Sequence, residues 1–186
     1  MALKEIEIVQ PAYFERFACL GPACTDNCCH DWVITIDKQH YLQYKAVQDP
    51  EFQRLCAKAI RRNKGEGDEK FAQMVLRPDE RCVFQDEDGG CSIFRRLGPD
   101  ALSHTCTSYP RIKNQFVPGV WEFSLSPSCE EAARLILLGE NPMELHRQRR
   151  AADPLNPLDS MPENLNFRSN VPIEHLIPLR EGCLSM

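Results

Sequence analysis

The sequence contains no run of about 18 apolar residues, the shortest length typical of a membrane-spanning helix. It also lacks an excess of basic residues, because 22 Lys and Arg stand against 27 Asp and Glu, for a net charge of −5. A general nucleic-acid-binding protein usually carries a basic face. Aromatic residues make up only 8% of the chain, although hydrophobic residues reach 42%, enough for a real core. We therefore predict one ordinary domain with no membrane and no nucleic-acid partner.

The N-terminus lacks the apolar stretch of a secretory signal peptide. Lys4, Glu5 and Glu7 place charges where that stretch would have to lie, which predicts a cytoplasmic location. Thiols stay reduced in the cytoplasm, so the ten cysteines of the chain are not expected to form a disulfide framework. Metal binding is the better interpretation of so many cysteines, and a metal-free chain is the weaker alternative.

The hydrophobic pattern predicts an α+β fold, a small mixed domain of helices and short strands with metal-held cysteine loops. Ile6 and Ile8 alternate with charged residues, as in an edge strand. Asp37 and Asp49 each precede a helical pattern and are expected to cap a helix. Further strands are expected over residues 32–36, 71–76 and 115–126.

Two local signals mark the limits of predicted elements in the second half of the chain. The Pro-Gly pair at 118–119 interrupts an extended stretch. Ser128 and Glu131 then form an S-x-x-E capping box, which predicts that a helix begins there. We predict a cysteine-cluster metal-binding domain over residues 1–150. The remaining residues, 151–186, contain five prolines and little periodicity, so a proline-rich irregular tail is expected.

The segment CLGPACTDNCCHDW, residues 19–32, holds four cysteines, and the last two of them are adjacent. Its spacing is C-x4-C-x3-C-C, and a second group follows with the spacing C-x8-C-x14-C. The candidate metal ligands are Cys19, Cys24, Cys28, Cys29, Cys82, Cys91, Cys106 and Cys129. Cys56 falls on the apolar face of a predicted helix, where a buried packing role is expected. Cys183 lies alone in the tail.

This spacing leaves iron–sulfur and zinc sites open. A structural zinc ion takes four ligands, usually from two C-x2–4-C knuckles, and the candidates outnumber what one ion needs. An iron–sulfur cluster also takes four thiolates but tolerates more varied spacing. Adjacent thiols such as Cys28 and Cys29 suit a centre with several metal ions, because one backbone segment directs them to different irons. We expect an iron–sulfur cluster, with Zn²⁺ as the alternative. The C-x3-C-x2-C pattern of radical-SAM enzymes is not matched, because the next thiol after Cys28 follows directly.

Other residues near the cysteines have two candidate roles each. His104 is either a ligand or an ordinary hydrogen-bonded histidine. Arg111 either neutralises thiolate charge or lies on the surface. Cys129 stands at the start of a predicted helix, where free N–H groups favour a thiolate, so it is either a ligand or a reactive thiol. A cysteine peptidase would need His30 or His104 beside that thiol, and no local pattern supports such a pair.

Three cysteine-containing blocks occur in order: FACLGPACTDNCCHDWVITIDK, CVFQDEDGGCSIFRRLGPDALSHTCTSYPR and LSPSCEEAARLIL. Together they resemble the N-terminal part of the flagellin lysine-N-methylase family, over residues 5–140. The first blocks are also similar to a wider group of cysteine-cluster domains described as zinc- or iron-chelating. The resemblance implies transfer of methyl groups from S-adenosyl-L-methionine to surface lysines of flagellin, by a protein that carries a [4Fe-4S] cluster. It assigns the eight candidate cysteines to that cluster without saying which four serve.

Two features depart from the family pattern. Members are usually longer, and this chain has no glycine-rich strand-to-helix turn of the kind that binds the adenosyl cofactor in common methyltransferases. Lysine methylation needs a neutral amine, which a carboxylate or a tyrosine can orient. Candidates for this role are Tyr109, Asp31 and Glu122. The leading prediction is a protein-lysine N-methyltransferase, complete or as a shortened copy. The alternative is a non-catalytic zinc- or iron-binding protein-interaction module.

Overall fold

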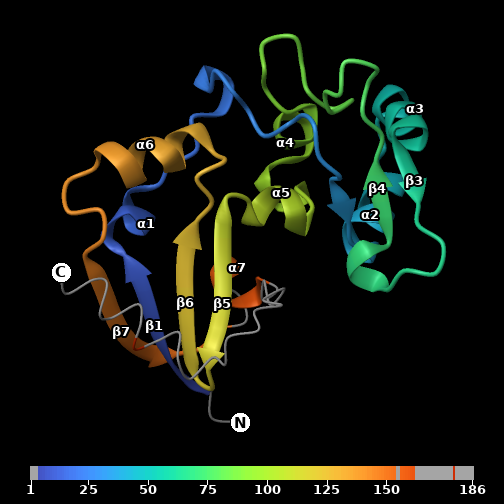
Figure 1. Cartoon of the computed structure of the whole chain (residues 1–186). Coiled ribbons are helices and arrows are strands. Elements are labelled where there is room, and N and C mark those ends of the chain that lie inside the picture. The colour runs from blue at the N-terminus through green and yellow to red at the C-terminus, as the bar shows by residue number, and fades with distance from the viewer. Residues whose placement is uncertain (1–3, 154–155, 162–177, 179–186) are drawn as a thin grey trace. The chain divides into compact units, whose positions relative to one another are not determined.

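A computed structural model describes residues 4–153, 156–161 and 178, and the chain separates into two compact units (Figure 1). The first unit is built from residues 1–18 and 110–186, and the second from residues 19–109. Both units combine helices with short strands, so the predicted α+β class is confirmed. Among the described residues, no helix is both long enough and apolar enough to cross a lipid bilayer.

The first unit is organised around a four-stranded sheet with the strand order β5-β6-β1-β7 (Figure 1). Its strands are β1 (Glu5–Pro11), β5 (Arg111–Val117), β6 (Val120–Leu125) and β7 (Leu145–Ala151). Strand β1 runs parallel to β6 and antiparallel to β7. Strands β5 and β6 form an antiparallel hairpin that turns at residues 118–119, where the sequence predicted the interruption.

The prediction that Ile6 and Ile8 belong to an edge strand is wrong, because β1 lies inside the sheet. Both side chains are 2% exposed. The neighbour that covers β1 on one side is β7, whose sequence LHRQRRA has no alternating apolar pattern. Ion pairs rather than apolar contacts join these two strands: Glu7 accepts hydrogen bonds from Arg147 at 3.2 Å and from Arg149 at 3.0 Å. Opposite charges on adjacent strands stabilise such a pair.

The helices of the first unit are α1 (Ala12–Arg16), α6 (Glu130–Leu138) and α7 (Pro157–Ser160). Helix α6 begins close to the predicted position and buries Ala132 and Leu135. The predicted capping box is wrong, because Glu131 turns to Arg134 and accepts two hydrogen bonds from its guanidinium, at 2.6 and 2.7 Å. A bidentate pair with a guanidinium is stronger than one bond to a backbone N–H. The N-cap residue is Cys129.

The second unit contains a three-stranded sheet with the order β2-β4-β3. Its strands are β2 (Thr35–Ile36), β3 (Ile60–Arg62) and β4 (Ala72–Met74), and its helices are α2 (Lys38–Lys45), α3 (Pro50–Ala59), α4 (Ser92–Leu97) and α5 (His104–Ser108). Short 3₁₀ turns lie at η1 (Gly21–Ala23), η2 (Asp68–Lys70) and η3 (Pro99–Ala101). Both predicted caps are confirmed: Asp37 accepts the N–H of His40 at 3.0 Å, and Asp49 accepts that of Phe52 at 3.1 Å.

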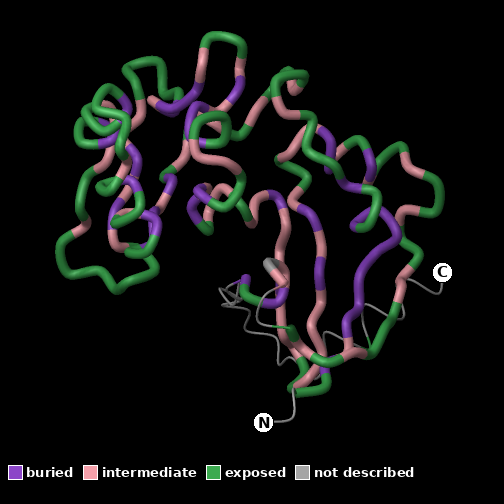
Figure 2. Tube along the Cα trace, turned by 180° about the vertical axis from the view of Figure 1, so that it is seen from behind, coloured by how far each residue is buried: buried purple, intermediate pink, exposed green. Residues whose placement is uncertain are grey.

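The core of the second unit is continuous with its cysteine segments. Tyr44, Phe52 and Phe84 are almost fully buried in it. Figure 2 shows the buried stretches of the chain in purple. Cys56 is 3% exposed on the buried face of α3, so its predicted packing role is confirmed. Four candidate ligands belong to this core or pack against it: Cys29, Cys82, Cys91 and Cys106. The cysteine loops are therefore part of the fold rather than appendages to it.

Most of the predicted tail lies outside the described residues, and so does Cys183. The described part of residues 151–186 includes helix α7. Asp159 in this helix accepts two hydrogen bonds from Arg150, each at 2.6 Å, and its side chain is only 2% exposed. This buried ion pair fixes α7 to the end of β7.

Candidate metal centre

The loop that carries the adjacent cysteines is joined by backbone hydrogen bonds to the segment that leads into Cys82. The N–H of Cys82 donates to the carbonyl oxygen of Cys29 at 2.6 Å, and the N–H of Asp31 donates to that of Glu80 at 3.0 Å. Asp31 and Glu80 take φ angles of 61° and 65°. Residues other than glycine rarely adopt this left-handed conformation, and the surrounding structure must hold them in it. The two cysteine groups are thus fixed against each other.

The adjacent pair is also held from within its own loop. Asn27 accepts the N–H of Cys29 with its side-chain oxygen at 3.0 Å. Trp32 donates its indole N–H to the carbonyl oxygen of Cys28 at 2.5 Å. The ring of Trp32 packs against that of Tyr109, with centroids 5.3 Å apart. These contacts define the backbone on both sides of the two thiols.

The stretch between Cys82 and Cys91 forms the predicted turn. The N–H of Asp86 donates to the carbonyl oxygen of Gly90 at 2.8 Å, which closes the turn directly before Cys91. Arg95, from α4, donates to the Asp86 carboxylate at 3.1 Å. Gly90 is buried under this guanidinium, and a Cβ at that position would lie 2.3 Å from it. The turn is therefore supported by the helix that follows, and a Cβ at Gly90 would require the flexible end of the Arg95 side chain to move.

Helix α5 brings Cys106 to the core of the same unit. The hydroxyl groups of Thr105 and Thr35 are hydrogen-bonded at 2.7 Å, which ties α5 to β2. The turn before α5 is held by Tyr44, whose hydroxyl donates to the carbonyl oxygen of Ala101 at 2.5 Å. Burial raises the pKa of the Cys106 thiol to about 12.

Five thiols of the second unit influence one another's ionisation: Cys28, Cys29, Cys82, Cys91 and Cys106. A hydrogen bond from Cys29 lowers the pKa of Cys28 to about 7, and the same bond raises the pKa of Cys29. Burial raises the pKa of Cys82 to about 11, and negative charge on Cys91 adds to this effect. If these five neighbouring thiols lose their protons, the resulting thiolates need a compensating positive charge, which a bound metal supplies.

The other three candidates are placed differently. Cys19 is exposed and accepts the N–H of Gly21 at 3.4 Å. Cys24 is half-buried directly after η1. Both belong to the second unit, whereas Cys129 is half-buried against the core of the first unit. The structure thus brings five of the eight predicted ligands into mutual interaction, and a ligand role stays a prediction for all eight.

The histidines and the arginine named with the cysteines have other contacts. His30 contacts the carboxylate of Asp26 at 2.9 Å, and His104 lies 3.8 Å from that of Asp37. Arg111 belongs to the first unit and lies over the ring of Phe17, 4.9 Å from its centroid. The contacts thus place the His104 ring near Asp37, and both of its predicted roles stay predictions.

The spacing of the thiols bears on the kind of metal that they fit. A single zinc ion with Zn–S bonds of about 2.3 Å brings its thiolates to about 3.8 Å from one another. Within the part of the chain that the structure describes, the trio of ligand atoms found within 4.8 Å of one another is that of Asp37, His40 and His104, and no trio of cysteines meets this limit. Among the described residues, no three cysteine Sγ atoms therefore come as close together as the ligands of one zinc ion.

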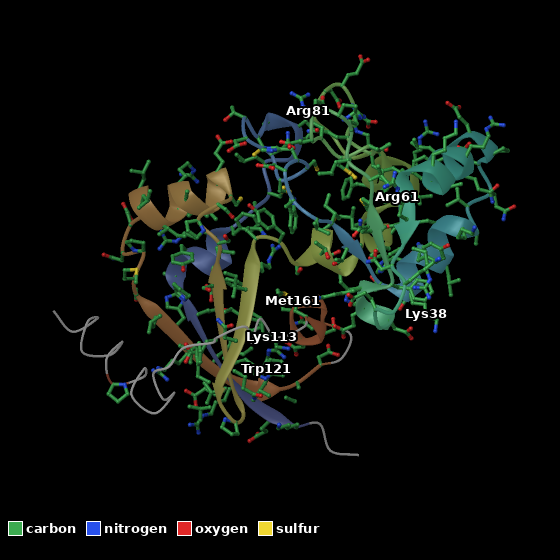
Figure 3. All side chains as sticks on the ribbon, turned by 45° about the vertical axis from the view of Figure 1, so that its right-hand side comes forward. Lys38, Arg61, Arg81, Lys113, Trp121 and Met161 are labelled. Carbon is green, nitrogen blue, oxygen red and sulfur yellow. The ribbon has the colours of Figure 1, made fainter. Side chains whose placement is uncertain are left out.

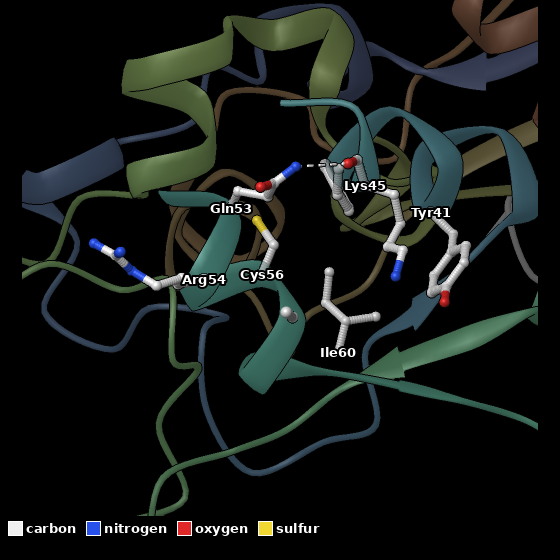
Figure 4. Close-up of a pocket in the computed structure, with 8 residues that line it drawn as sticks. Tyr41, Lys45, Gln53, Arg54, Cys56 and Ile60 are labelled. Carbon is white, nitrogen blue, oxygen red and sulfur yellow. Dashed lines mark hydrogen bonds between the residues drawn. The ribbon is translucent and has the colours of Figure 1, made fainter. Parts of the chain in front are cut away.

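A hollow with a volume of ≈ 310 Å³ opens between α2 and α3 (Figure 4). Tyr41 and Lys45 line it from α2, and Gln53, Arg54 and Cys56 line it from α3. The side-chain amide of Gln53 donates to the carbonyl oxygen of Lys45 at 3.1 Å. Two cations at its wall disfavour a sulfonium ligand, because like charges repel. This hollow is a poor match to the positively charged sulfur of S-adenosylmethionine.

A second hollow, of ≈ 370 Å³, is lined in part by residues that follow the adjacent cysteines in sequence. Asp31, Trp32 and Glu80 line it from the two joined segments, and Arg61 and Met74 line it from the sheet. Two carboxylates next to an indole suit a cationic guest, because an aromatic face attracts positive charge. Of the predicted amine-orienting residues, Asp31 lines this hollow, Tyr109 packs against Trp32, and Glu122 lies on β6 of the first unit.

Sequence reasoning does not single out Gln85 or His40. Gln85 is 4% exposed and forms a β-bridge with Cys91, and its side-chain oxygen is buried without a hydrogen-bond partner among the described residues. His40 lies in the first turn of α2, where Asp37 was expected only to cap the helix. No local pattern marks Gln85, and the local pair of Asp37 and His40 gains its third member, His104, only in the folded chain.

No protein-family model matches the chain, and no solved structure matches it. The chain is 35% identical over 147 residues to a lysine-N-methylase of Salmonella typhimurium. The matched region covers 77% of this chain and 35% of that protein. The lysine-N-methylase of Salmonella choleraesuis gives the same identity and coverage. The chain therefore spans about a third of the length of these two relatives.

A third relative has a length similar to that of this chain. It is the flagellar biosynthetic protein FliU of Salmonella muenchen, which is 34% identical over 151 residues. The match covers 79% of this chain and 86% of FliU. The resemblance seen in the three cysteine blocks is thereby confirmed, and the chain belongs to the family of the lysine-N-methylases and FliU.

Proposed function

We propose that this protein acts in the S-adenosylmethionine-dependent methylation of flagellin lysines and that it holds a [4Fe-4S] cluster. Family membership is the observation that carries this proposal, because two relatives are named lysine-N-methylase and the third is named for flagellar biosynthesis. The five interacting thiols support the cluster, since four thiolates are its usual ligands.

The cluster would be held by four of Cys28, Cys29, Cys82, Cys91 and Cys106. Their two segments are already joined by the bond between Cys82 and Cys29. A bound cluster would supply positive charge to these thiolates and cross-link the segments that carry them. Zn²⁺ remains the alternative, and it would require the thiols to approach one another more closely than they do here.

The hollow beside this centre suits the lysine side chain. Asp31 and Glu80 would attract its ammonium group, and Trp32 would contact its methylene chain and charge. Methyl transfer requires the neutral amine, so one carboxylate would hold the proton that the amine gives up. The nitrogen lone pair then forms the new N–C bond while the S–C bond of the sulfonium breaks, which leaves S-adenosylhomocysteine.

The test uses the full chain purified without oxygen. Iron, sulfide and zinc are quantified, a visible spectrum is recorded, and the protein is incubated with flagellin and S-adenosylmethionine that carries a labelled methyl group. We expect about four irons with matching sulfide and label on flagellin lysines. An iron-loaded protein that transfers no label would contradict the methyltransferase proposal, and stoichiometric zinc without a visible band would contradict the cluster.

Asp31→Asn provides the matched variant, because asparagine tolerates the left-handed backbone that this position requires. It should lower methyl transfer by at least about tenfold, the lower end of what a general base contributes, and leave the iron content unchanged. Glu66→Gln, in an exposed loop of the same unit, serves as the control. Equal activity of both variants would remove Asp31 from the proposed site.

A non-catalytic metal-binding interaction module is the second candidate function. The observation that favours it is coverage: the chain matches 86% of FliU but only 35% of the lysine-N-methylases. Calorimetry with S-adenosylmethionine separates the two proposals. Saturable binding supports the enzyme, whereas a metal-loaded, folded chain that binds no cofactor supports the module.

A further inference from the structure

A second group of potential ligands occurs in the second unit, and neither function proposed above uses it. Asp37 is the N-cap residue of α2, His40 lies in the first turn of that helix, and His104 is the first residue of α5. One ligand atom from each residue lies within 4.8 Å of the others. Helix α5 thus completes a trio whose first two members are neighbours in sequence.

The geometry of the trio centres on one oxygen of Asp37. Its Oδ2 atom lies 2.6 Å from Nδ1 of His40 and 3.8 Å from Nε2 of His104. The two imidazole rings meet edge to face, with centroids 5.4 Å apart. Asp37 and His40 are buried, whereas the side chain of His104 is 52% exposed. Asp37 and His40 are therefore held in place by the packing around them, whereas the exposed side chain of His104 can rotate.

The contacts of the two ring nitrogens of His40 favour a positively charged group beside this ring. Its Nδ1 faces the Asp37 carboxylate, and its Nε2 faces the carbonyl oxygen of Asp100 at 3.3 Å. Both neighbours are acceptors, and a neutral imidazole has only one N–H to donate. If Nε2 donates to Asp100, the lone pair of Nδ1 points at a carboxylate. A metal ion at Nδ1 resolves this conflict, and Nε2 of the nearby His104 offers a further ligand atom for it.

We propose that Asp37, His40 and His104 bind a divalent transition-metal ion at a site separate from the thiols. Two imidazoles and one carboxylate are a donor set of zinc and of non-haem iron. Ligand bonds of about 2.0–2.1 Å place tetrahedral ligand atoms about 3.3 Å apart. The observed separations of 2.6 and 3.8 Å lie on either side of this value. A rotation of the exposed His104 side chain and a small shift of the carboxylate would bring all three atoms into range.

The surroundings fit this assignment. A metal-bound histidine usually donates its other ring N–H to a carbonyl or carboxylate oxygen, which fixes the orientation of the ring. The carbonyl oxygen of Asp100 provides that acceptor for His40. The other carboxylate oxygen of Asp37 accepts the backbone N–H of His40 at 3.0 Å, whereas Oδ2 faces the His40 ring and accepts only a long bond, of 3.5 Å, from the backbone N–H of His104. His104 is thereby assigned to this site and not to the thiol centre.

Cobalt(II) is the probe for this site, because its spectrum distinguishes sulfur ligands from nitrogen and oxygen. The full chain, purified without oxygen, is titrated with Co²⁺, and difference spectra are compared between the wild type, His104→Gln and His30→Gln. We expect the wild type and His30→Gln to bind one equivalent with d–d bands and no thiolate-to-cobalt charge transfer. His104→Gln should bind that equivalent at least tenfold more weakly. His30 is the matched control, because it is also a partly exposed histidine beside an aspartate in the same unit.

A second variant and a second measurement keep the result interpretable. Asp37→Asn removes the charge but keeps a good helix cap, and it too should lose the d–d bands. In thermal unfolding, Co²⁺ should raise the Tm of the wild type and not that of His104→Gln. The proposal is overturned if His104→Gln and the wild type bind cobalt alike, or if every bound cobalt shows thiolate charge transfer. Neither outcome depends on whether the chain methylates flagellin.

Discussion

The backbone N–H of Cys82 donates to the carbonyl oxygen of Cys29 at 2.6 Å. This bond joins the two cysteine groups of the second unit without any metal. It also places the adjacent thiols of the first group against the buried thiol of the second, which is 4% exposed. Metal binding and folding of this unit are therefore expected to be coupled, since a site formed by distant segments exists only in the folded chain.

Replacing Cys28 with serine tests this coupling. Cys28→Ser should lose most of the bound metal and lower the Tm at the same time, because a hydroxyl is a poor ligand for the metals considered. Cys56→Ala is the control, since Cys56 is a packed core residue of α3. It should keep its metal and lose about 1–2 kcal/mol of unfolding free energy. Full metal content and an unchanged melting curve in Cys28→Ser would exclude Cys28 from the ligands of the centre.

Gly89 is expected to be required by the turn before Cys91. Its φ is 81°, and its N–H donates to the carbonyl oxygen of Asp86 at 3.0 Å. A Cβ in this left-handed conformation costs about 1 kcal/mol, so Gly89→Ala should lower the urea midpoint. Gly67 has an extended conformation and open space at its Cβ position. Gly67→Ala should therefore be neutral or slightly stabilising, and equal losses for both variants would contradict the prediction.

The ion pair between Arg150 and Asp159 predicts a dependence of stability on pH. The Arg150 guanidinium holds the pKa of Asp159 below its usual value of 3.8. A carboxyl with a lower pKa in the folded state stabilises the fold above the unfolded value, and this contribution is lost as the pH falls through the folded value. The unfolding free energy should thus fall in the wild type below about pH 4.

Asp159→Asn isolates this contribution. At pH 7 it should cost about 2–3 kcal/mol, because a partly buried guanidinium loses its partner, and its stability should change less between pH 5 and pH 3. Asp68→Asn removes the exposed pair with Lys38 and should cost under about 0.5 kcal/mol. Urea unfolding of the three proteins at each pH provides the measurement. Parallel pH curves for the wild type and Asp159→Asn would show that the pair contributes nothing to acid sensitivity.

Lys113 is a buried cation of the first unit, 3% exposed. Its Nζ donates to the carbonyl oxygens of Asp159 at 2.8 Å and Met161 at 3.1 Å, and it lies 3.8 Å from the centroid of the Trp121 ring (Figure 3). Lys113→Met should cost about 2 kcal/mol, because two buried carbonyl groups lose a charged donor. The exposed Lys58→Met should stay within about 0.5 kcal/mol of the wild type. Equal unfolding free energies for the two variants would contradict this role.

The elements that the sequence predicted correctly depend on near neighbours in the chain. Asp37 and Asp49 cap their helices because each accepts an N–H from within the next three residues. The break between β5 and β6 follows from a Pro-Gly pair. Cys56 is buried because the helical period places it on one face with Phe52 and Ala59.

The predictions that were wrong involve partners that the local pattern did not weigh. Ile6 and Ile8 lie inside the sheet because the basic strand β7 pairs with β1 through Glu7, which a search for apolar alternation does not detect. Glu131 binds Arg134 and not the start of its helix, because a guanidinium is a stronger partner than a backbone N–H. Both outcomes depend on charge pairs whose strength is set by the folded geometry.

The sequence by itself determined the chemistry of this protein: its many thiols, the adjacent pair, the family that the cysteine blocks identify and the local caps and turns. Only the tertiary structure decided which thiols interact, that Tyr109 packs against Trp32, and that His104 joins Asp37 and His40. The physical reason is the separation along the chain of the residues that interact. Caps and turns are closed by residues a few positions apart, whereas a ligand set is assembled by strand pairing and core packing between segments whose separation in the chain says nothing of their distance in space.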